Sequence, residues 1–99
     1  MDNNTFLTTS DLALTQAADF FEETWPGADV DLIEGMLTVT LPTTQQYVIN
    51  RHGVAQQIWV SSPFTGAHHF QGHQEKWECT RTQMELMDFL RNECRLYAA

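Results

Sequence analysis

The residues best suited to chemistry in this sequence are carboxylates that gather in its first third. At about 100° per residue, three of them fall within roughly 80° of arc on one face of a predicted helix, opposite its apolar side chains. A fourth flanks these three, and two more follow on the first predicted strand. The six candidate metal-binding residues are Asp11, Asp19, Glu22, Glu23, Asp29 and Asp31. We call this set the acidic edge, because the sequence predicts one continuous anionic border.

Two of these acids stand where a helix disfavours them. Glu22 and Glu23 lie near the C-terminal end of the predicted helix, where the helix dipole opposes each negative charge by about 0.3 to 1 kcal/mol. No Lys or Arg lies close to them in the sequence. Uncompensated charge of this kind favours binding of cations or of a basic partner over solubility alone. Carboxylate oxygens suit iron, manganese, calcium or magnesium, and on a convex surface they bind such ions weakly.

A second candidate surface combines amides with a tryptophan on predicted strands. Alternation places Ile58 and Val60 on one face of a strand, and Gln57 and Trp59 on the other. Asn50 lies on the preceding predicted strand. If the aliphatic pair faces the helices, the indole projects from the open face, where it would anchor a protein partner. An indole covered by a neighbouring side chain is an equally open alternative at this point.

Three histidines near residue 70 look like a metal cluster, but their spacing argues against one. His68 and His69 are adjacent on a predicted strand, so their side chains point to opposite faces and do not easily share an ion. A single His69 or His73 remains able to assist a neighbouring site, because imidazole ligates iron. The sequence has no Glu-x-x-His pair for a di-iron centre, no HExxH motif and no phosphate-binding glycine loop. It therefore predicts no self-contained catalytic site.

The charge distribution narrows the classes of partner. The 99 residues carry a net charge of −8, and residues 1–50 hold eight acids and no Lys or Arg, whereas residues 51–99 hold five of each. Nucleic acid is disfavoured, because phosphate binding needs clustered basic side chains. No apolar run exceeds four residues, so no membrane partner is expected. Cys79 and Cys94 form no CxxC pair, which excludes zinc-ribbon and thioredoxin-like proteins.

Hydrophobic periodicity predicts a helix, a run of strands and a second helix. Helical spacing covers 5–23, and Trp25-Pro26-Gly27 ends that helix. A capping box from Thr82 to Glu85 predicts the start of the second helix, which continues to about Tyr97. Its predicted inward stripe is Leu86, Leu90, Cys94 and Tyr97. Alternating patterns predict strands near 29–32, 37–41, 45–51, 56–61, 68–71 and 76–80.

The order of these elements predicts the fold class. Because no helix separates consecutive strands, the sheet cannot be all parallel. We therefore expect one domain over residues 1–99 with an α+β fold. It should be a two-layer α–β sandwich, in which an antiparallel sheet of five to six strands carries the N- and C-terminal helices on one face. The other face should stay open.

Several segments resemble the frataxin family, and the resemblance covers most of the chain in order. Segments 18–23 and 35–39, together with Gly66, Phe70 and Trp77, fall where that family places them. The Ser-Ser-Pro-x-Thr-Gly form is closer to the mitochondrial and alphaproteobacterial branch of the family. The most specific stretches are Tyr47-Val48-Ile49-Asn50 and Gln57-Ile58-Trp59-Val60-Ser61-Ser62-Pro63.

This resemblance implies an iron-binding protein of iron–sulfur cluster biosynthesis. Such a protein binds Fe2+ or Fe3+ weakly on the acidic edge. It docks on a cysteine desulfurase and an iron–sulfur scaffold protein, and there it modulates sulfur transfer or donates iron. By position, the residues implied in partner binding are Asn50, Gln57, Trp59 and His69.

The resemblance also leaves alternatives open. One is an acidic interaction module that regulates the desulfurase, with incidental iron binding, and another is a ferroxidase. A monomer that forms oligomers with iron is implied. The implied location is the mitochondrial matrix after removal of a presequence, with the bacterial cytoplasm as the alternative.

Overall fold

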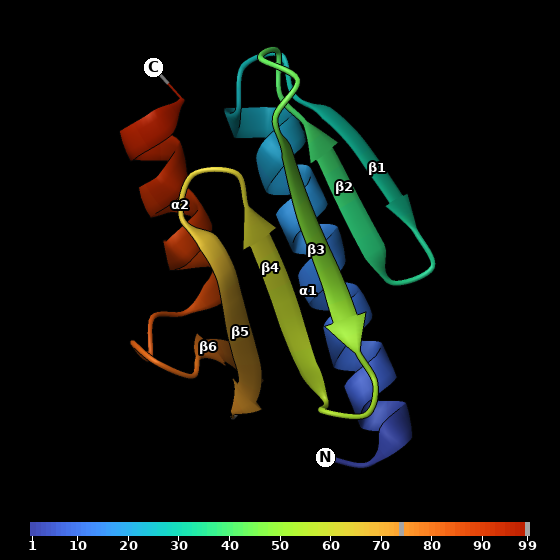
Figure 1. The fold of residues 1–99 in the computed structure, drawn as a ribbon. Helices are drawn as coiled ribbons and strands as arrows, with labels where there is room; N and C mark the ends of the chain where they lie inside the picture. The colour runs from blue at the N-terminus through green and yellow to red at the C-terminus, as the bar shows by residue number, and fades with distance from the viewer. Residues whose placement is uncertain (74, 99) are drawn as a thin grey trace.

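Two helices and six strands build a two-layer sandwich in the computed structural model, which describes residues 1–73 and 75–98 (Figure 1). Helix α1 spans Asn3–Thr24 and helix α2 spans Leu86–Tyr97. Both helices lie on the same face of the sheet, which confirms the predicted α+β sandwich. The strands between them are β1 Asp29–Ile33, β2 Met36–Thr40, β3 Gln46–His52, β4 Gln57–Ser62, β5 Gly66–His73 and β6 Lys76–Cys79.

The sheet is an antiparallel meander in which every strand pairs with its neighbours in the chain. Its order is β1-β2-β3-β4-β5-β6, so β1 and β6 are the edge strands. The registers place Leu37, Ile49 and Val60 side by side on the face that the helices cover, and all three are at most 1% exposed. Helix α1 packs mainly over β1 to β3, and α2 packs over β6. This arrangement leaves the opposite face of the sheet uncovered by helices.

The hairpin between β1 and β2 turns on two residues. Glu34 and Gly35 both have positive φ, 46° and 80°, as a two-residue turn of type I′ requires. A Cβ atom on Gly35 would lie 2.6 Å from Nε of Arg51, so a side chain there would collide with the arginine that crosses the turn. The predicted meeting of the first two strands at Glu34-Gly35 is therefore confirmed, and glycine is needed there for two reasons.

The second helix departs from its sequence prediction at its start. It begins at Leu86 and not at Thr82, because residues 80–82 form a turn and Gln83 has a φ of 60°. Glu85 is the N-cap and accepts a hydrogen bond from the amide of Met87 at 3.0 Å. Thr82 instead accepts one from the amide of Met84. The predicted capping box is thus wrong, and the glutamate of that motif caps the helix itself.

The buried stripe of α2 is also shifted. Leu86 and Leu90 are buried as predicted, but Cys94 is only half-buried and Tyr97 is 41% exposed. Cys94 still packs against the core as predicted, whereas the prediction for Tyr97 is wrong, because Phe89 and Glu93 occupy inward positions. A glutamate can take such a position only where polar partners meet it.

Among the described residues, no helix is long and apolar enough to cross a membrane.

Candidate functional site: an acidic edge and an aromatic sheet face

Three carboxylates of the acidic edge lie on the solvent side of α1. Asp19, Glu22 and Glu23 are exposed, opposite the residues that this helix buries against the sheet. The last turn of α1 contains no basic residue, and no ion pair found in the described part of the chain involves these three acids. The negative charge at the C-terminal end of α1 is therefore uncompensated in the folded protein as well.

Asp11 differs from the other acids because it forms an ion pair with Arg51 of β3. The arginine crosses the β1–β2 turn on the helix side of the sheet, and its side chain is 23% exposed, whereas that of Asp11 is 61% exposed. This contact ties the middle of α1 to the sheet. It also partly neutralises Asp11, so the negative potential of the acidic edge is strongest from Asp19 onward.

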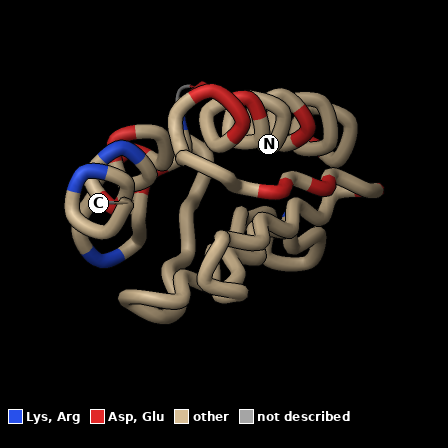
Figure 2. Tube along the Cα trace, turned by 90° about the horizontal axis from the view of Figure 1, so that it is seen from above, with Lys and Arg blue, Asp and Glu red and all other residues tan. Residues whose placement is uncertain are grey.

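Asp29 and Asp31 continue the acidic edge onto β1. They pair in register with Thr40 and Thr38 of β2, on the sheet face away from α1, and both are exposed. Figure 2 shows acidic positions along α1 and along the strand beside it, while the most visible basic positions surround α2. Within residues 1–73 and 75–98, no three potential ligands lie close enough to hold a metal ion. The acidic edge thus offers separate carboxylates on a surface and not a coordination cage.

Trp59 lies on the open face of the sheet, where two histidines hold it between their rings. Its strand neighbours Ile58 and Val60 are buried toward the helices, so the indole points the other way, as predicted. The imidazole of His52 stacks on one side with 3.9 Å between ring centroids, and that of His69 stacks with 4.4 Å, both at 12°. The indole is half-buried in consequence. Both alternatives for Trp59 therefore hold in part, because it projects from the sheet and is also flanked.

The candidate partner-binding residues come together on this face. Asn50, Trp59 and His69 form one lateral row across β3, β4 and β5. Gln57 supports the row, because its Oε1 accepts a hydrogen bond of 2.8 Å from Nε1 of Trp59. His52 was not among the residues predicted from the sequence, although its position at the end of a strand beside Gln57 would have placed it on this face.

The aromatic row and the acidic edge belong to one continuous surface. Asn50 pairs with Met36 of β2, and Met36 pairs with Ile33 of β1. Met36 is 50% exposed and Ile33 is 61% exposed. A row of Ile33, Met36 and Asn50 therefore links the indole of Trp59 to the strand that carries Asp29 and Asp31.

Sequence reasoning missed Glu93, the most deeply buried carboxylate among the described residues. It is 3% exposed and lies between α2 and the sheet. Its Oε1 accepts hydrogen bonds from the hydroxyls of Tyr47 at 2.7 Å and Ser62 at 2.6 Å, and its Oε2 accepts one from Thr65 at 2.6 Å. Burial raises the pKa of Tyr47, and Glu93 raises it further. Three hydroxyl donors thus satisfy one carboxylate, and the cluster fixes α2 to β3 and β4.

His68 lies beside this cluster and faces the helices, whereas His69 faces away from them. The opposite orientation of these two neighbours is the one predicted from their adjacent positions on a strand. Nε2 of His68 lies 2.8 Å from the hydroxyl of Thr65, and its ring packs on Phe89 with centroids 4.5 Å apart. Burial lowers the pKa of His68 from its usual value of 6.5, and Arg81 lowers it further, while Glu93 opposes this shift.

The lowered pKa of His68 predicts that stability decreases in mild acid. The unfolded chain takes up a proton at this histidine near pH 6.5, and the folded protein does so only at lower pH, so the free energy of unfolding falls as the pH drops below that value. Urea unfolding at several pH values between 8 and 5 measures this slope. A His68→Gln variant should show a shallower slope, and His73→Gln, at an exposed position of the same strand, should keep it. Equal slopes for all three proteins would contradict the prediction.

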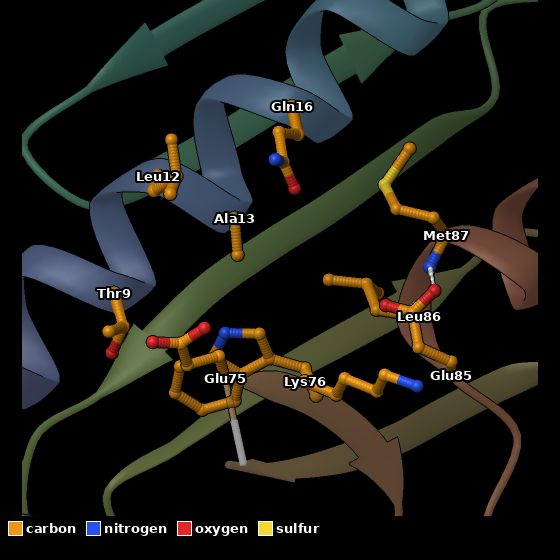
Figure 3. Close-up of a pocket in the computed structure, with 10 residues that line it drawn as sticks. Thr9, Leu12, Ala13, Gln16, Glu75, Lys76, Glu85, Leu86 and Met87 are labelled. Carbon is orange, nitrogen blue, oxygen red and sulfur yellow. Dashed lines mark hydrogen bonds between the residues drawn. The ribbon is translucent and has the colours of Figure 1, made fainter. Parts of the chain in front are cut away.

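A groove of about 380 Å³ separates the two helices on another side of the molecule. Figure 3 shows side chains that point into it from α1, from the start of α2 and from the β6 region. Trp77 and Leu86 contribute apolar surface, and Glu75, Lys76 and Glu85 lie at its border. None of the ten residues predicted as sites lines this groove. The candidate functional surface is therefore the exposed edge and sheet face, and not a cavity.

The architecture places the chain among α–β sandwiches that expose one sheet face beside an acidic helix. A profile of the frataxin-like domain matches residues 1–99. The iron–sulfur cluster assembly protein CyaY of Aliivibrio fischeri is 33% identical over 100 residues, which cover 99% of this chain and 93% of that protein. CyaY of Vibrio parahaemolyticus is 35% identical over 74 residues, covering 73% of this chain and 70% of that protein.

Solved structures of frataxins are similar to this chain as well. Trimeric frataxin from the yeast Saccharomyces cerevisiae, complexed with ferrous iron, superposes with a TM-score of 0.77 at 30% identity and covers 91% of this chain and 85% of its own. Frataxin from Psychromonas ingrahamii has a TM-score of 0.84 at 22% identity, covering 98% and 92%, and shows the shared fold. This chain belongs to the frataxin family.

Proposed function

We propose that this chain binds iron on its acidic edge and serves in iron–sulfur cluster assembly, where it docks on a cysteine desulfurase and its scaffold protein. The observation that carries the proposal is the uncompensated charge of Asp19, Glu22 and Glu23, which continues to Asp29 and Asp31 on β1. Carboxylates are hard oxygen ligands that bind iron ions, and separate exposed carboxylates bind them weakly. The bacterial relatives carry the name of iron–sulfur cluster assembly proteins, and a yeast relative was solved with ferrous iron.

The docking part of the proposal rests on two surfaces that meet. The acidic edge suits a positively charged region of a partner, and the row of Asn50, Trp59 and His69 supplies a rigid aromatic and amide surface beside it. We assign modulation of sulfur transfer or delivery of iron to the protein in this docked state. Iron binding that is only incidental to docking is the second candidate function, and it is favoured by the absence of a three-ligand cluster among the described residues.

Titration with Fe(II) under anaerobic conditions tests the iron proposal. We expect selective broadening of the backbone amide signals of Asp19, Glu22, Glu23, Asp29 and Asp31, because a paramagnetic ion broadens signals close to it. Replacing Glu22 and Glu23 by glutamine should weaken Fe(II) binding by about tenfold, since two hard ligands are lost. The control is Glu75→Gln with Glu78→Gln, which removes the same charge near the other edge of the sheet and should leave binding unchanged. Uniform broadening, or equal loss in both variants, would favour incidental binding.

The proposal also covers the cellular location and the oligomeric state of the protein. The curated relatives named above come from bacteria, which supports the bacterial cytoplasm, and they give no support to the mitochondrial matrix. The trimeric yeast relative with ferrous iron supports the formation of oligomers. For this chain we propose a monomer that associates when iron is added. Gel filtration with and without Fe(II) distinguishes this behaviour from a permanent monomer. Ferroxidase activity, which the resemblance raised, would require oxygen-dependent turnover that disappears when Glu22 and Glu23 are neutralised.

A further inference from the structure

Within the described residues, strand β1 is an edge strand whose outer side has no neighbour in the sheet. It pairs with β2 alone, and four of its five residues are exposed. The helix α1 packs on its face and does not pair with its backbone. An extended strand with an unpaired side offers main-chain hydrogen-bonding groups to another chain. The outer side of β1 therefore presents main-chain donors and acceptors beside the side chains of the acidic edge.

The hairpin geometry identifies which backbone groups point outward. A two-residue turn closes on a hydrogen-bonded pair, which here is Ile33 with Met36. Antiparallel pairs alternate between hydrogen-bonded and non-hydrogen-bonded, so Asp31 and Asp29 bond to β2. The amide and carbonyl groups of Val30 and Leu32 consequently face away from the sheet.

The charges around this strand define the kind of segment that it accepts. Asp29 and Asp31 stand on the open face of β1, and the carboxylates of α1 lie on the other layer. The turn adds the exposed Glu34, and the only cation that reaches the hairpin, Arg51, is paired with Asp11 within the described residues. A second copy of this chain would bring acids against acids at a net charge of −8 each, which opposes self-pairing. A Lys- or Arg-rich extended segment beside β1 would instead meet carboxylates on the open face of the sheet and on the helix layer.

Exposed apolar side chains give such a segment something to pack on. Leu32 is 38% exposed, and Ile33 is 61% exposed. They lie on opposite faces of β1. A neighbouring strand with alternating side chains would therefore cover Leu32 on the helix face and Ile33 on the open face. Charged edges usually prevent pairing between identical proteins, and here the same charges leave pairing with a cationic strand favourable.

We infer that the outer side of β1 binds an extended, Lys- or Arg-rich segment of a partner protein by strand addition, through the backbone of Val30 and Leu32. This inference deepens the docking part of the proposed function and rests on it, because it specifies how the acidic edge engages a basic partner. Main-chain bonds provide the affinity in this mode, and flanking charges select the partner. Attraction between side chains alone is the competing explanation.

A synthetic peptide in which lysine alternates with valine tests the inference. On adding it to the full chain, we expect amide hydrogen exchange at Val30 and Leu32 to slow by about tenfold or more, because these outward amides gain hydrogen bonds. The matched control is the same peptide methylated on alternate backbone nitrogens, which keeps its charge and side chains but cannot complete the ladder. It should leave both amides unprotected. Equal protection by both peptides, or protection by neither, overturns the inference.

A proline variant separates this inference from the proposed function. Leu32→Pro removes an outward amide that β2 does not use, so the hairpin should still form, and Leu32→Ala controls for the lost side chain. We expect Leu32→Pro to weaken binding to a cysteine desulfurase by about tenfold relative to Leu32→Ala. If both variants bind alike while Glu22→Lys with Glu23→Lys abolishes binding, strand addition is wrong and electrostatic docking stands. If the charge reversal also leaves binding intact, the docking proposal itself fails.

Discussion

Replacing Glu93 by alanine is expected to lower the free energy of unfolding by about 3 kcal/mol, because it leaves buried hydroxyl groups without their acceptor. Tyr47 and Ser62 both donate to Glu93 Oε1, and neither lies where water reaches easily, since they are 0% and 6% exposed. The substitution also opens a cavity between α2 and the sheet. Urea denaturation followed by circular dichroism measures the loss.

Two further variants identify the source of that loss. Glu93→Gln keeps one acceptor oxygen and nearly the same volume, so it should cost about 1 kcal/mol. Tyr47→Phe removes one donor and leaves Ser62 and Thr65 in place, and its cost should be similarly small. A loss below about 1 kcal/mol for Glu93→Ala would mean that the cluster contributes little to holding α2. Binding of Fe(II) should be unchanged in all three variants, because the cluster lies away from the acidic edge.

Replacing Trp59 by alanine is expected to weaken binding to the desulfurase–scaffold complex by about thirtyfold or more, as is typical of a central aromatic anchor. The stacked rings of His52 and His69 fix the orientation of the indole before a partner arrives. An anchor that is already ordered loses little side-chain entropy on binding. Isothermal titration calorimetry with a bacterial desulfurase and its scaffold measures the change in affinity.

Stability measurements decide whether that result reports on docking. The indole is only half-buried, so Trp59→Ala should lower the free energy of unfolding by about 1 kcal/mol, mostly through lost ring stacking. His52→Ala keeps the indole but removes one of its two flanking rings. It should weaken binding less than Trp59→Ala does. Unchanged affinity in Trp59→Ala would show that this face does not contact the complex.

The layered fold could be predicted from the sequence because its signals are local. Alternation around Leu37, Ile49 and Val60 and the stop at Trp25-Pro26-Gly27 each depend on a few neighbouring residues. The turn residues Glu34-Gly35 predicted the position of the first hairpin in the same way, and the positive φ angles of both residues agree with it. The exposed acids of α1 followed from helical periodicity, which placed them opposite the apolar stripe.

The contacts that bridge distant segments could not be predicted in this way. Glu93 is 46 positions from Tyr47 in the chain, and nothing near either residue indicates that they meet. The spacing of Glu93 after Leu90 was compatible with the buried face of α2. Burial of a carboxylate there could be predicted only if its three hydroxyl donors were known. The pairing of Asp11 with Arg51, 40 positions away, was missed for the same reason.

The unequal division of charge between the two halves of the chain affects how the protein approaches a charged partner by diffusion. Eight acids and no Lys or Arg in residues 1–50, against a balanced second half, give the molecule a permanent electric dipole. In the field of a cationic enzyme, this dipole turns the molecule while it is still diffusing, so that collisions occur preferentially with β1 leading. The encounter rate should therefore decrease steeply as ionic strength rises, whereas dissociation should respond much less.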